Sequence, residues 1–583
     1  MKKTKIVATI GPASDSEEML ERLINFGVNV MRLNFSHGTH EEHQLRIDRI
    51  KKVREKLNVP IAIMLDTKGP EIRIGTFKNG KINIEQGQNF TLTTEDIYGD
   101  DTKVSVSYKD ISNDVVVGGR VLIDDGLVEF NIVDKDEKNV YMVAVNSGEL
   151  SDRKGVNIPD AKVKLPALTP GDISDIIFGI KNDVDYIAAS FIRTREDVLS
   201  IRRILEENDG YKIEVISKIE NREGVHNMDA ILEVSDGIMI ARGDLGVEIN
   251  PEEIPHVQKE LIKKCNEAGK ISITATQMLD SMIRNPRPTR AEVMDVANAI
   301  IDGTSAVMLS GETAAGKYPD KSVDMMARIA ISTEDGEEYR RVSGMIAEKH
   351  MVSITNSIAN SAVNIANNLG ASAIISLSKS GGTARAISKF RPKTDIIAIT
   401  PSERVLRKLS LEWGVYPILV SEGKDADKIF EEGINKCMGN ILKEGDLVVL
   451  TAGLPVGKSG STNMLKVEIL SKMLGKGMGI GTGKVTARAV IANSAEELLS
   501  DFKDGDIIVT IGMERDMVSF VGRAGAIVTE EGGLTSSGAI IGLNLKVPTI
   551  VGVADATKNI KTGDIITVDI KTGEIFKGEI EHE

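Results

Sequence analysis

Cysteine is scarce in this sequence: Cys265 and Cys437 are the only two, they stand far apart, and neither belongs to a CxxC pair. A disulfide framework or a thiolate zinc site is therefore not supported. Aromatic residues make up 4% of the chain, with a single tryptophan, Trp413, which leaves few platforms for stacking unpaired bases. Positive charge is also in deficit, because the net charge is −14 and the pI lies near 5.3. A protein that binds a phosphate backbone needs a basic surface, so we expect no nucleic-acid partner.

Long apolar runs are absent as well. No stretch approaches the roughly 18 consecutive apolar residues that a membrane-spanning helix needs. The start, MKKTKIVATIG, is basic, but its apolar part is too short for a signal peptide and lacks a small-residue cleavage pattern. We therefore expect a cytoplasmic protein with no membrane partner.

What the sequence does contain is an ordinary globular composition, with 41% apolar and 27% charged residues, in a chain too long for one hydrophobic core. From the N-terminus, short β-rich apolar runs alternate with amphipathic helical patterns, which is typical of βα units and a parallel sheet. Eight such units favour a (β/α)8 TIM barrel over an open doubly wound sheet. The predicted strands are 5–9, 29–33, 61–65, 185–189, 213–217, 237–241, 271–275 and 305–309.

Polar residues follow the predicted strands, at the end of a barrel where active sites lie. Lys218 and Glu220 follow the fifth strand, and Asp244 follows the sixth. Two carboxylates beside a lysine could hold a hard cation, although these residues alone fit solvated loop charges equally well. The other polar residues at strand ends are Arg32, Asn34, Ser36, Asp66, Thr67, Lys68, Ser190, Arg242, Thr276, Gln277, Ser310 and Glu312.

The connection between the third and fourth strands is about 120 residues long, far more than a crossover helix requires. Residues 70–166 show period-2 alternation with the turn signals KNG, DDG and DEKN, so we predict an inserted all-β domain. An insertion at this end of the barrel would form a lid over its mouth. The barrel itself is then expected at 1–69 and 167–338.

Two further units follow the barrel. Residues 339–472 hold a helical pattern at 354–368 and the strand-like runs ASAIISLS, DIIAIT, VYPILV and DLVVLTAG, which predict an open α/β domain. A Gly-rich junction, KGMGIGTGKV, precedes a β-rich unit at 473–583. Its GGLTSSGAI string is similar to the swivelling phosphohistidine domain of phosphoenolpyruvate-utilising enzymes, which carry a histidine where Ser537 stands here. No phosphohistidine can form at a serine, so we expect a structural or regulatory role.

Two motifs invite a functional reading that we do not favour. His37, His40 and His43 are spaced by three, but His37 precedes the predicted helix cap Thr39 and carboxylates fill the gaps. We expect no metal site there and surface positions for His40 and His43.

The stretch AGLPVGKS at 452–459 resembles a phosphate-binding P-loop, but Ala452 stands in place of the first glycine and no Walker-B partner is evident. We interpret it as a turn near a ligand-binding surface.

A third motif, SLSKSGGTARAISKFRP, favours a phosphate site over a plain strand-to-helix turn. Its hydroxyl side chains, glycine amides and lysine at the start of a helix can all donate hydrogen bonds to an anion. The residues are Ser378, Lys379, Ser380, Gly381, Gly382 and Thr383.

Several long strings lie in order at the predicted strand ends: TKIVATIGPAS, MRLNFSHG, LDTKGPEIR, SKIEN, ARGDLGVE, TATQMLDSM and LSGETAAGKYP. Together they resemble the pyruvate kinase family over residues 1 to about 473. The C-terminal unit resembles the appendage that many bacterial members carry. The resemblance implies phosphoryl transfer from phosphoenolpyruvate to ADP, giving ATP and pyruvate. It further implies a homotetramer with Mg²⁺ (or Mn²⁺) and K⁺ as cofactors.

The resemblance assigns roles to the charged residues at the mouth. Glu220 and Asp244 would hold Mg²⁺, which takes few protein carboxylates and keeps substrate oxygens as its other ligands. Lys218 would lie at the phosphoryl group in transfer, and Arg32 would supply a second positive charge to it.

The same resemblance places the substrate carboxylate against the amides of Gly243 and Asp244 and the hydroxyl of Thr276. Thr276 and Ser310 are both candidates for the proton relay to the enolate.

For K⁺, the resemblance gives oxygen ligands from Asn34, Ser36, Asp66 and the carbonyl of Thr67. Glu71 stands where members that depend on K⁺ have a glutamate and others a lysine, so we expect K⁺ activation.

The nucleotide, by the same resemblance, would meet Arg73 and Lys154 with its phosphates and would lie near His37. The expected nucleotide-binding residues are Asn34, Phe35, Ser36, His37, Arg73 and Lys154. The loop from Ser378 to Thr383 matches the effector-phosphate loop of the family, which implies activation by AMP or a sugar monophosphate.

Two rival functions remain open at this point. A metal-dependent barrel aldolase acting on pyruvate or phosphoenolpyruvate also places Glu and Asp after neighbouring strands. It has no need of the lid or of Lys218 beside the metal. A non-catalytic metabolite sensor could keep the fold, although every reacting position is filled here.

Overall fold

The computed structural model describes residues 2–159, 161–339, 341, 353–455, 462–470 and 473–578. Its first part is a closed barrel of eight parallel strands in the order β1-β16-β15-β14-β13-β12-β3-β2, which confirms the predicted barrel. The strands are β1 (Lys5–Thr9), β2 (Val30–Asn34), β3 (Ala62–Asp66), β12 (Tyr186–Ala189), β13 (Glu214–Ile219), β14 (Gly237–Ala241), β15 (Ile271–Ala275) and β16 (Ala306–Leu309).

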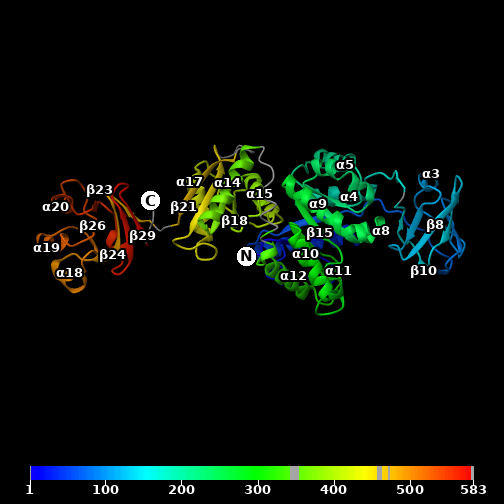
Figure 1. Cartoon of the computed structure of the whole chain (residues 1–583), viewed down its shortest axis with the longest axis horizontal. Coiled ribbons are helices and arrows are strands. Elements are labelled where there is room, and N and C mark those ends of the chain that lie inside the picture. Colours follow the sequence, from blue (N-terminus) through cyan, green and yellow to red (C-terminus); the bar gives the residue numbers. More distant parts are fainter. Residues whose placement is uncertain are drawn as a thin grey trace. The chain divides into compact units, whose positions relative to one another are not determined.

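Helices surround these strands, and Figure 1 shows α9 beside β15 and α10 beside α12. A capping box starts α2 at the predicted helix cap: Thr39 Oγ1 accepts from the Glu42 amide, and the Glu42 carboxylate accepts from the Thr39 amide. Helix α9 is capped at its C-terminus by Gly269, which has a left-handed φ of +67°. Glycine adopts this conformation without strain because it has no Cβ atom. The helices are α1 (Glu17–Asn25), α2 (His40–Leu57), α4 (Pro170–Lys181), α5 (Arg195–Glu207), α6 (Arg222–His226), α7 (Met228–Val234), α8 (Arg242–Glu248), α9 (Ile254–Ala268), α10 (Arg290–Ile301), α11 (Gly311–Ala314) and α12 (Pro319–Glu334), with 3-10 turns η1 (Pro251–Glu253) and η2 (Asp280–Ile283).

The expectation of a surface position for His43 is wrong. His43 is 2% exposed and stacks on Phe35, with ring centroids 3.9 Å apart. It lies on the face of α2 that also buries Ile47 and Ile50, at the spacing that places side chains toward a core. His40 is partly exposed, and its Nε2 lies 2.6 Å from Asp175 Oδ1.

The inserted region is all-β, apart from the short helix α3 (Ile111–Asp114), as predicted. A six-stranded sheet has the order β11-β7-β8-β9-β5-β6, and β10 pairs with β4. The DDG signal forms the β7–β8 hairpin, with Asp124, Asp125 and Gly126 all at positive φ. The strands are β4 (Lys81–Ile84), β5 (Asn89–Thr93), β6 (Lys103–Ser105), β7 (Arg120–Ile123), β8 (Val128–Lys135), β9 (Asn139–Ala144), β10 (Gly148–Ser151) and β11 (Val156–Asn157).

A five-stranded sheet with the order β19-β18-β17-β20-β21 follows the barrel. Four of its strands were predicted, and β21 was not. Residues 456–459 of the P-loop-like stretch lie outside the described residues. The elements are α14 (Ile354–Leu369), β17 (Ala373–Leu377), α15 (Gly382–Ser388), β18 (Asp395–Thr400), α16 (Glu403–Leu409), β19 (Val415–Leu419), α17 (Ala426–Cys437), β20 (Leu447–Gly453) and β21 (Thr462–Ile469).

Charged side chains tie the N-terminal ends of two barrel strands to helices α15 and α16. Arg407 Nε donates to Asp185 Oδ1 at 2.8 Å, and Asp185, just before β12, is fully buried. Arg385 and Lys408 both donate to Oε1 of Glu214, the first residue of β13, at 2.6 and 3.0 Å. The buried Arg407–Asp185 pair and the partly buried contacts of Glu214 fix the two helices to the floor of the barrel.

The C-terminal unit is an eight-stranded sheet in the order β22-β29-β28-β24-β25-β26-β27-β23. The predicted Gly-rich junction at 476–485 is part of this sheet, because it contains β23, the last residue of β22 and the start of β24. The GGLTSSGAI string leads into helix α20, which is followed by β27. The elements are β22 (Met473–Lys476), β23 (Met478–Ile480), β24 (Lys484–Ile491), α18 (Ala495–Asp501), β25 (Ile507–Thr510), η3 (Arg515–Met517), α19 (Val518–Val521), β26 (Ala526–Thr529), α20 (Ser537–Leu545), β27 (Thr549–Val551), α21 (Ala556–Asn559), β28 (Ile565–Asp569) and β29 (Glu574–Lys577). Among the described residues, no helix combines the length and apolarity needed to cross a membrane.

Candidate active site at the barrel mouth

Lys218 lies at the centre of a buried polar cluster at the C-terminal ends of the barrel strands. Its Nζ is 3.0 Å from Asp66 Oδ1, 3.0 Å from Glu220 Oε1 and 2.7 Å from Ser190 Oγ. Burial acts to lower the pKa of this ammonium, but the charges of Asp66 and Glu220 outweigh it and raise the pKa. Lys218 therefore keeps its positive charge in the interior.

Arg32 and Asp66 form the second charged pair of the cluster. Arg32 Nε donates to Asp66 Oδ2 at 2.6 Å and Nη1 donates to Thr9 Oγ1 at 2.9 Å, which aims the guanidinium into the mouth. Burial acts to raise the pKa of Asp66, which is 1% exposed, yet Arg32 and Lys218 lower it overall. Two cations thus share the Asp66 carboxylate, and Glu220 places a second negative charge beside Lys218.

Glu220 and Asp244 are the two carboxylates that face each other at the ends of β13 and β14. The Phe191 amide donates to Glu220 Oε2 at 2.6 Å. Burial and the nearby charge of Glu220 raise the pKa of Asp244 to about 7. Two crowded carboxylates in a low-dielectric site fit a divalent cation, whose charge would relieve their repulsion. No set of three or more His, Cys, Asp or Glu side chains suited to a metal occurs in the described parts of the chain.

Gly243 and Thr276 meet beside these carboxylates. The Gly243 amide donates to Thr276 Oγ1 at 2.7 Å. Thr276 has a φ of +67°, which is strained for a β-branched residue. Arg242 supports this conformation, because it donates to the Thr276 carbonyl at 2.9 Å and grips Asp295 with both Nη atoms.

Ser310 follows β16 on the same rim, and a buried glutamate connects it to the loop that follows β15. The Ser310 amide donates to Glu312 Oε2 at 2.8 Å, and the Leu279 amide donates to Glu312 Oε1 at 3.0 Å. Burial raises the pKa of Glu312. The residues Ser310 and Thr276 are both partly exposed.

The four residues predicted as K⁺ ligands come from two adjacent strands. Asn34 is in register with Asp66 across the β2–β3 pair. Asn34 Oδ1 accepts from the Ser36 amide at 3.2 Å, and the Thr67 carbonyl accepts from Ser190 Oγ at 2.5 Å. All four therefore lie at the same end of the barrel and offer oxygen atoms.

The residues predicted to bind the nucleotide are more dispersed. His37 is exposed, whereas the ring of Phe35 is buried against His43. Arg73 pairs with Glu71 at 2.6 Å, and Lys154, in the lid, pairs with Asp124 at 2.9 Å. The side chain of Phe35 is therefore not available to a ligand.

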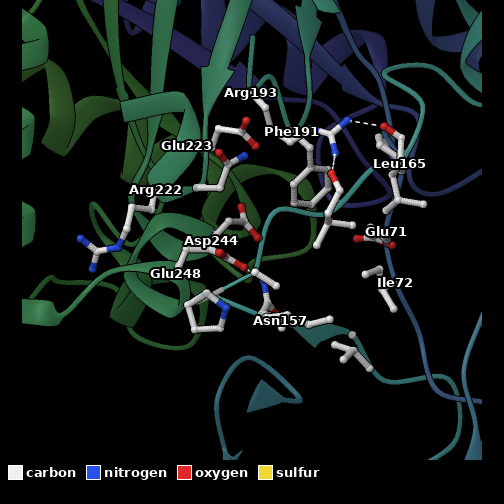
Figure 2. Close-up of a pocket in the computed structure, with 18 of the residues that line it drawn as sticks. Glu71, Ile72, Asn157, Leu165, Phe191, Arg193, Arg222, Glu223, Asp244 and Glu248 are labelled. Atoms are coloured by element: carbon white, nitrogen blue, oxygen red, sulfur yellow. Dashed lines mark hydrogen bonds between the residues drawn. The ribbon is translucent and has the colours of Figure 1, made fainter. Parts of the chain in front are cut away.

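A cavity of about 140 Å³ opens beside Asp244. It lies between the barrel mouth and the two chain segments, here called crossings, that connect the barrel to the lid. Figure 2 shows Phe191, Arg193 and Asp244 around it, with Glu71 on the lid side. Asn157 of β11 donates to Glu248 of α8 at 2.7 Å and so joins the lid to the helix that begins at Arg242.

The predicted effector loop lies between β17 and α15. Ser378 and Thr383 are buried, and Thr383 Oγ1 shares a hydrogen bond of 2.7 Å with Thr462 Oγ1. Lys379 is exposed and pairs with Glu422 at 2.7 Å. Gly381 has a φ of +84° and precedes the first turn of α15.

Sequence reasoning left Ser190 and Phe191 without a role. Ser190 contacts Lys218, and the Phe191 amide holds Glu220. Ser190 was among the polar residues expected at the strand ends, but its contact with Lys218 was not foreseen. The role of Phe191 could not have been found, because a backbone amide leaves no trace in the residue type.

Three family descriptions match the chain: "Pyruvate kinase, barrel domain" over residues 1–323, "Pyruvate kinase, alpha/beta domain" over 356–468 and "PEP-utilising enzyme, mobile domain" over 502–573. The chain is 50% identical over 582 residues to pyruvate kinases of Staphylococcus haemolyticus and Sporosarcina psychrophila, and the match covers 99% of each chain. A crystal structure of a pyruvate kinase from Cryptosporidium parvum is similar with a TM-score of 0.77 and 39% identity. That match covers 80% of this chain and 96% of the other.

Proposed function

The chain belongs to the pyruvate kinase family, and from that membership we propose which of its residues carry the reaction. It transfers the phosphoryl group of phosphoenolpyruvate to ADP and gives ATP and pyruvate. The observation that carries the residue assignments is the position of Lys218, buried between the carboxylates of Asp66 and Glu220.

Glu220 and Asp244 hold the divalent cation, Mg²⁺ or Mn²⁺. The raised pKa of Asp244 beside Glu220 supports this, because such a pair is stabilised by a cation. When bound, the metal supplies positive charge to substrate oxygens. The Phe191 amide holds Oε2 of Glu220, and Oε1 lies 3.0 Å from Lys218 Nζ, so both oxygens are fixed in position.

Lys218 and Arg32 stabilise the phosphoryl group in transfer. Phosphoryl transfer depends mainly on positioning and on neutralising negative charge. Both cations are held in place by Asp66, and both are buried, so their charges act through a weakly screening medium.

The substrate carboxylate binds at the start of α8, to the amides of Gly243 and Asp244 and to the Thr276 hydroxyl. The Gly243 amide and Thr276 Oγ1 lie 2.7 Å apart, which supports this, because two groups at such a short distance can both bind one carboxylate. The proton for the enolate comes from the side of Thr276 and Ser310, which both present hydroxyls at the rim.

Asn34, Ser36, Asp66 and Thr67 hold K⁺, and Glu71 is the residue that makes the enzyme depend on it. The nucleotide phosphates bind Arg73 and Lys154, with His37 and the backbone of Phe35 nearby. Arg73 and Lys154 pair with Glu71 and Asp124 in the structure, so ADP would exchange these partly exposed pairs for phosphate contacts.

A phosphorylated effector, AMP or a sugar monophosphate, binds the loop from Ser378 to Thr383, and the enzyme is a homotetramer. The glycine at +84° and the hydroxyls around it support an anion site. Thr383→Glu would place a negative charge at the buried contact with Thr462 and should abolish activation while basal activity remains. An intact effector response in this variant would exclude the loop.

One coupled assay tests the proposed function. The purified chain is supplied with phosphoenolpyruvate, ADP, Mg²⁺ and K⁺, and both pyruvate and ATP are measured. We expect the two products in equal amounts. An aldolase would give no ATP, and a sensor would give neither product, so either result would overturn the proposal.

A further inference from the structure

Residues 190–193, which follow β12, hold both the lysine and a carboxylate of the cluster. Ser190 Oγ accepts from Lys218 Nζ at 2.7 Å and donates to the Thr67 carbonyl at 2.5 Å. The next residue, Phe191, donates its amide to Glu220 Oε2 at 2.6 Å. Two consecutive residues therefore set where Lys218 and Glu220 lie.

The same short segment also contacts the first chain crossing from the barrel to the lid. This crossing begins at Gly69, whose φ is +75°. A Cβ atom on Gly69 would lie 2.8 Å from the ring of Phe191 and 2.9 Å from Ser190 Cβ, so the crossing packs directly on both residues. The Gly69 amide is fixed from below by Asp172 Oδ1 at 2.9 Å.

Arg193 fastens the second crossing, where the chain returns from the lid. Its Nη1 donates to the Val163 carbonyl at 2.7 Å and its Nη2 to the Leu165 carbonyl at 2.5 Å, as Figure 2 shows for Leu165. The Arg193 side chain is 13% exposed, and residues 161–166 belong to no helix or strand. The fork of one guanidinium thus anchors a crossing without secondary structure.

Phe191 shows that the segment is held under strain between these contacts. Its φ of +55° is unusual for a residue with a bulky side chain. Such conformations persist where surrounding contacts determine them, and here the contacts are Glu220 on one side and the lid crossing on the other. A shift of the crossings would therefore change the backbone that positions Lys218 and Glu220.

We propose that Arg193 is a positioning residue that couples the lid to the catalytic cluster. By holding the return crossing against residues 190–193, it makes the placement of Lys218 and Glu220 depend on the position of the lid. Closure of the lid and binding of the divalent cation then favour each other. The inference rests on the proposed roles of Lys218 and Glu220 in phosphoryl transfer.

Arg193→Met, Arg193→Lys and a matched control, Arg195→Met, test this in the full-length enzyme. Arg195 begins α5 two residues later and pairs with Glu233 at the surface, away from the crossings. We expect Arg193→Met to raise the Mg²⁺ concentration for half-maximal activity about tenfold, the scale of losing a residue that orients a metal ligand. Arg193→Lys has fewer hydrogen-bond donors than arginine, so its Mg²⁺ requirement should lie between those of the wild type and Arg193→Met. Arg195→Met should have the same Mg²⁺ requirement as the wild type.

A second measurement is independent of activity. Lys162 and Lys164 are exposed in the return crossing, so trypsin can report its order. Phosphoenolpyruvate with Mn²⁺ should slow cleavage there in the wild type and in Arg195→Met, and not in Arg193→Met. Wild-type Mg²⁺ dependence together with ligand protection in Arg193→Met would overturn the coupling. So would a uniform loss of thermal stability with unchanged Mg²⁺ dependence, which would indicate a purely structural role. Full activity of Lys218→Met would instead refute the residue roles on which the inference rests.

Discussion

The Nζ atom of Lys218 lies 3.0 Å from Oδ1 of Asp66, although the two residues are separated by 152 positions in the chain. They meet because β3 and β13 both end at the barrel mouth, on either side of β12. Ser190, at the end of β12, completes the contact. The barrel thus brings a lysine and its counter-charge together from strands that do not pair with each other.

Lys218→Met should lower kcat by about 100-fold or more, the effect of removing one preorganised positive group at a developing charge. The coupled assay for pyruvate measures it. Lys212→Met is the control, because Lys212 is exposed before the same strand and should leave kcat unchanged. Undiminished turnover in Lys218→Met would show that this ammonium does not act on the transferred group.

Glu220→Gln and Asp244→Asn should each weaken divalent-cation binding by about tenfold or more, because each removes half of the charge that attracts the ion. Titration with Mn²⁺ followed by electron paramagnetic resonance measures binding without turnover. Glu223→Gln is the control, since Glu223 lines the neighbouring cavity but lies outside the pair. Unchanged Mn²⁺ affinity in both variants would place the metal elsewhere.

Removal of K⁺ should reduce activity about tenfold or more, because a monovalent charge next to Asp66 would be lost from the site. Glu71→Lys should restore activity in K⁺-free buffer, since an ammonium at this position supplies the missing charge. Activity is compared in K⁺ and in a large organic cation at equal ionic strength. Full activity of the unaltered enzyme without K⁺ or NH₄⁺ would contradict this prediction.

Arg407→Leu should destabilise the protein by about 3–5 kcal/mol, because it leaves Asp185 charged and fully buried without its partner. Arg404→Leu, whose partly exposed pair with Asp183 is screened by solvent, should cost less than about 1 kcal/mol. Thermal and denaturant unfolding of the two variants measure the difference. Equal free energies of unfolding for the two variants would mean that the buried Arg407–Asp185 pair does not stabilise the contact between α16 and the barrel.

The sequence predicted the barrel well because hydrophobic alternation is a local signal. The bounds of β1, β14 and β15 agree residue for residue with the expected strands, and Thr39 caps helix α2 as predicted. The same reasoning failed for His43, where a polar residue type concealed a core position four residues before Ile47. The Gly-rich stretch after residue 475, interpreted as a junction before the last unit, contains the edge strand β23 of that unit, because glycines obscure a strand pattern.

The candidate site divides in a similar way. Lys218, Glu220 and Asp244 stand within one stretch of the chain, so their proximity could be inferred from two adjacent strands. The strain at Phe191 and Thr276, the amide that holds Glu220 and the grip of Arg193 on the lid crossing could not. They depend on backbone torsions and carbonyl positions, which carry no residue-type signature.

By itself, the sequence determined the alternation that closes into a barrel, the inserted lid and the residue types at each strand end, because these follow from side-chain chemistry and local periodicity. Only the tertiary structure decided which of those residues form ion pairs with one another. It paired Lys218 with Asp66 as well as with Glu220, and it placed Ser190 and Phe191 between the lid and both. The physical reason is that closure of the barrel sets distances between strands far apart in the chain, whereas a sequence specifies neighbours along one strand.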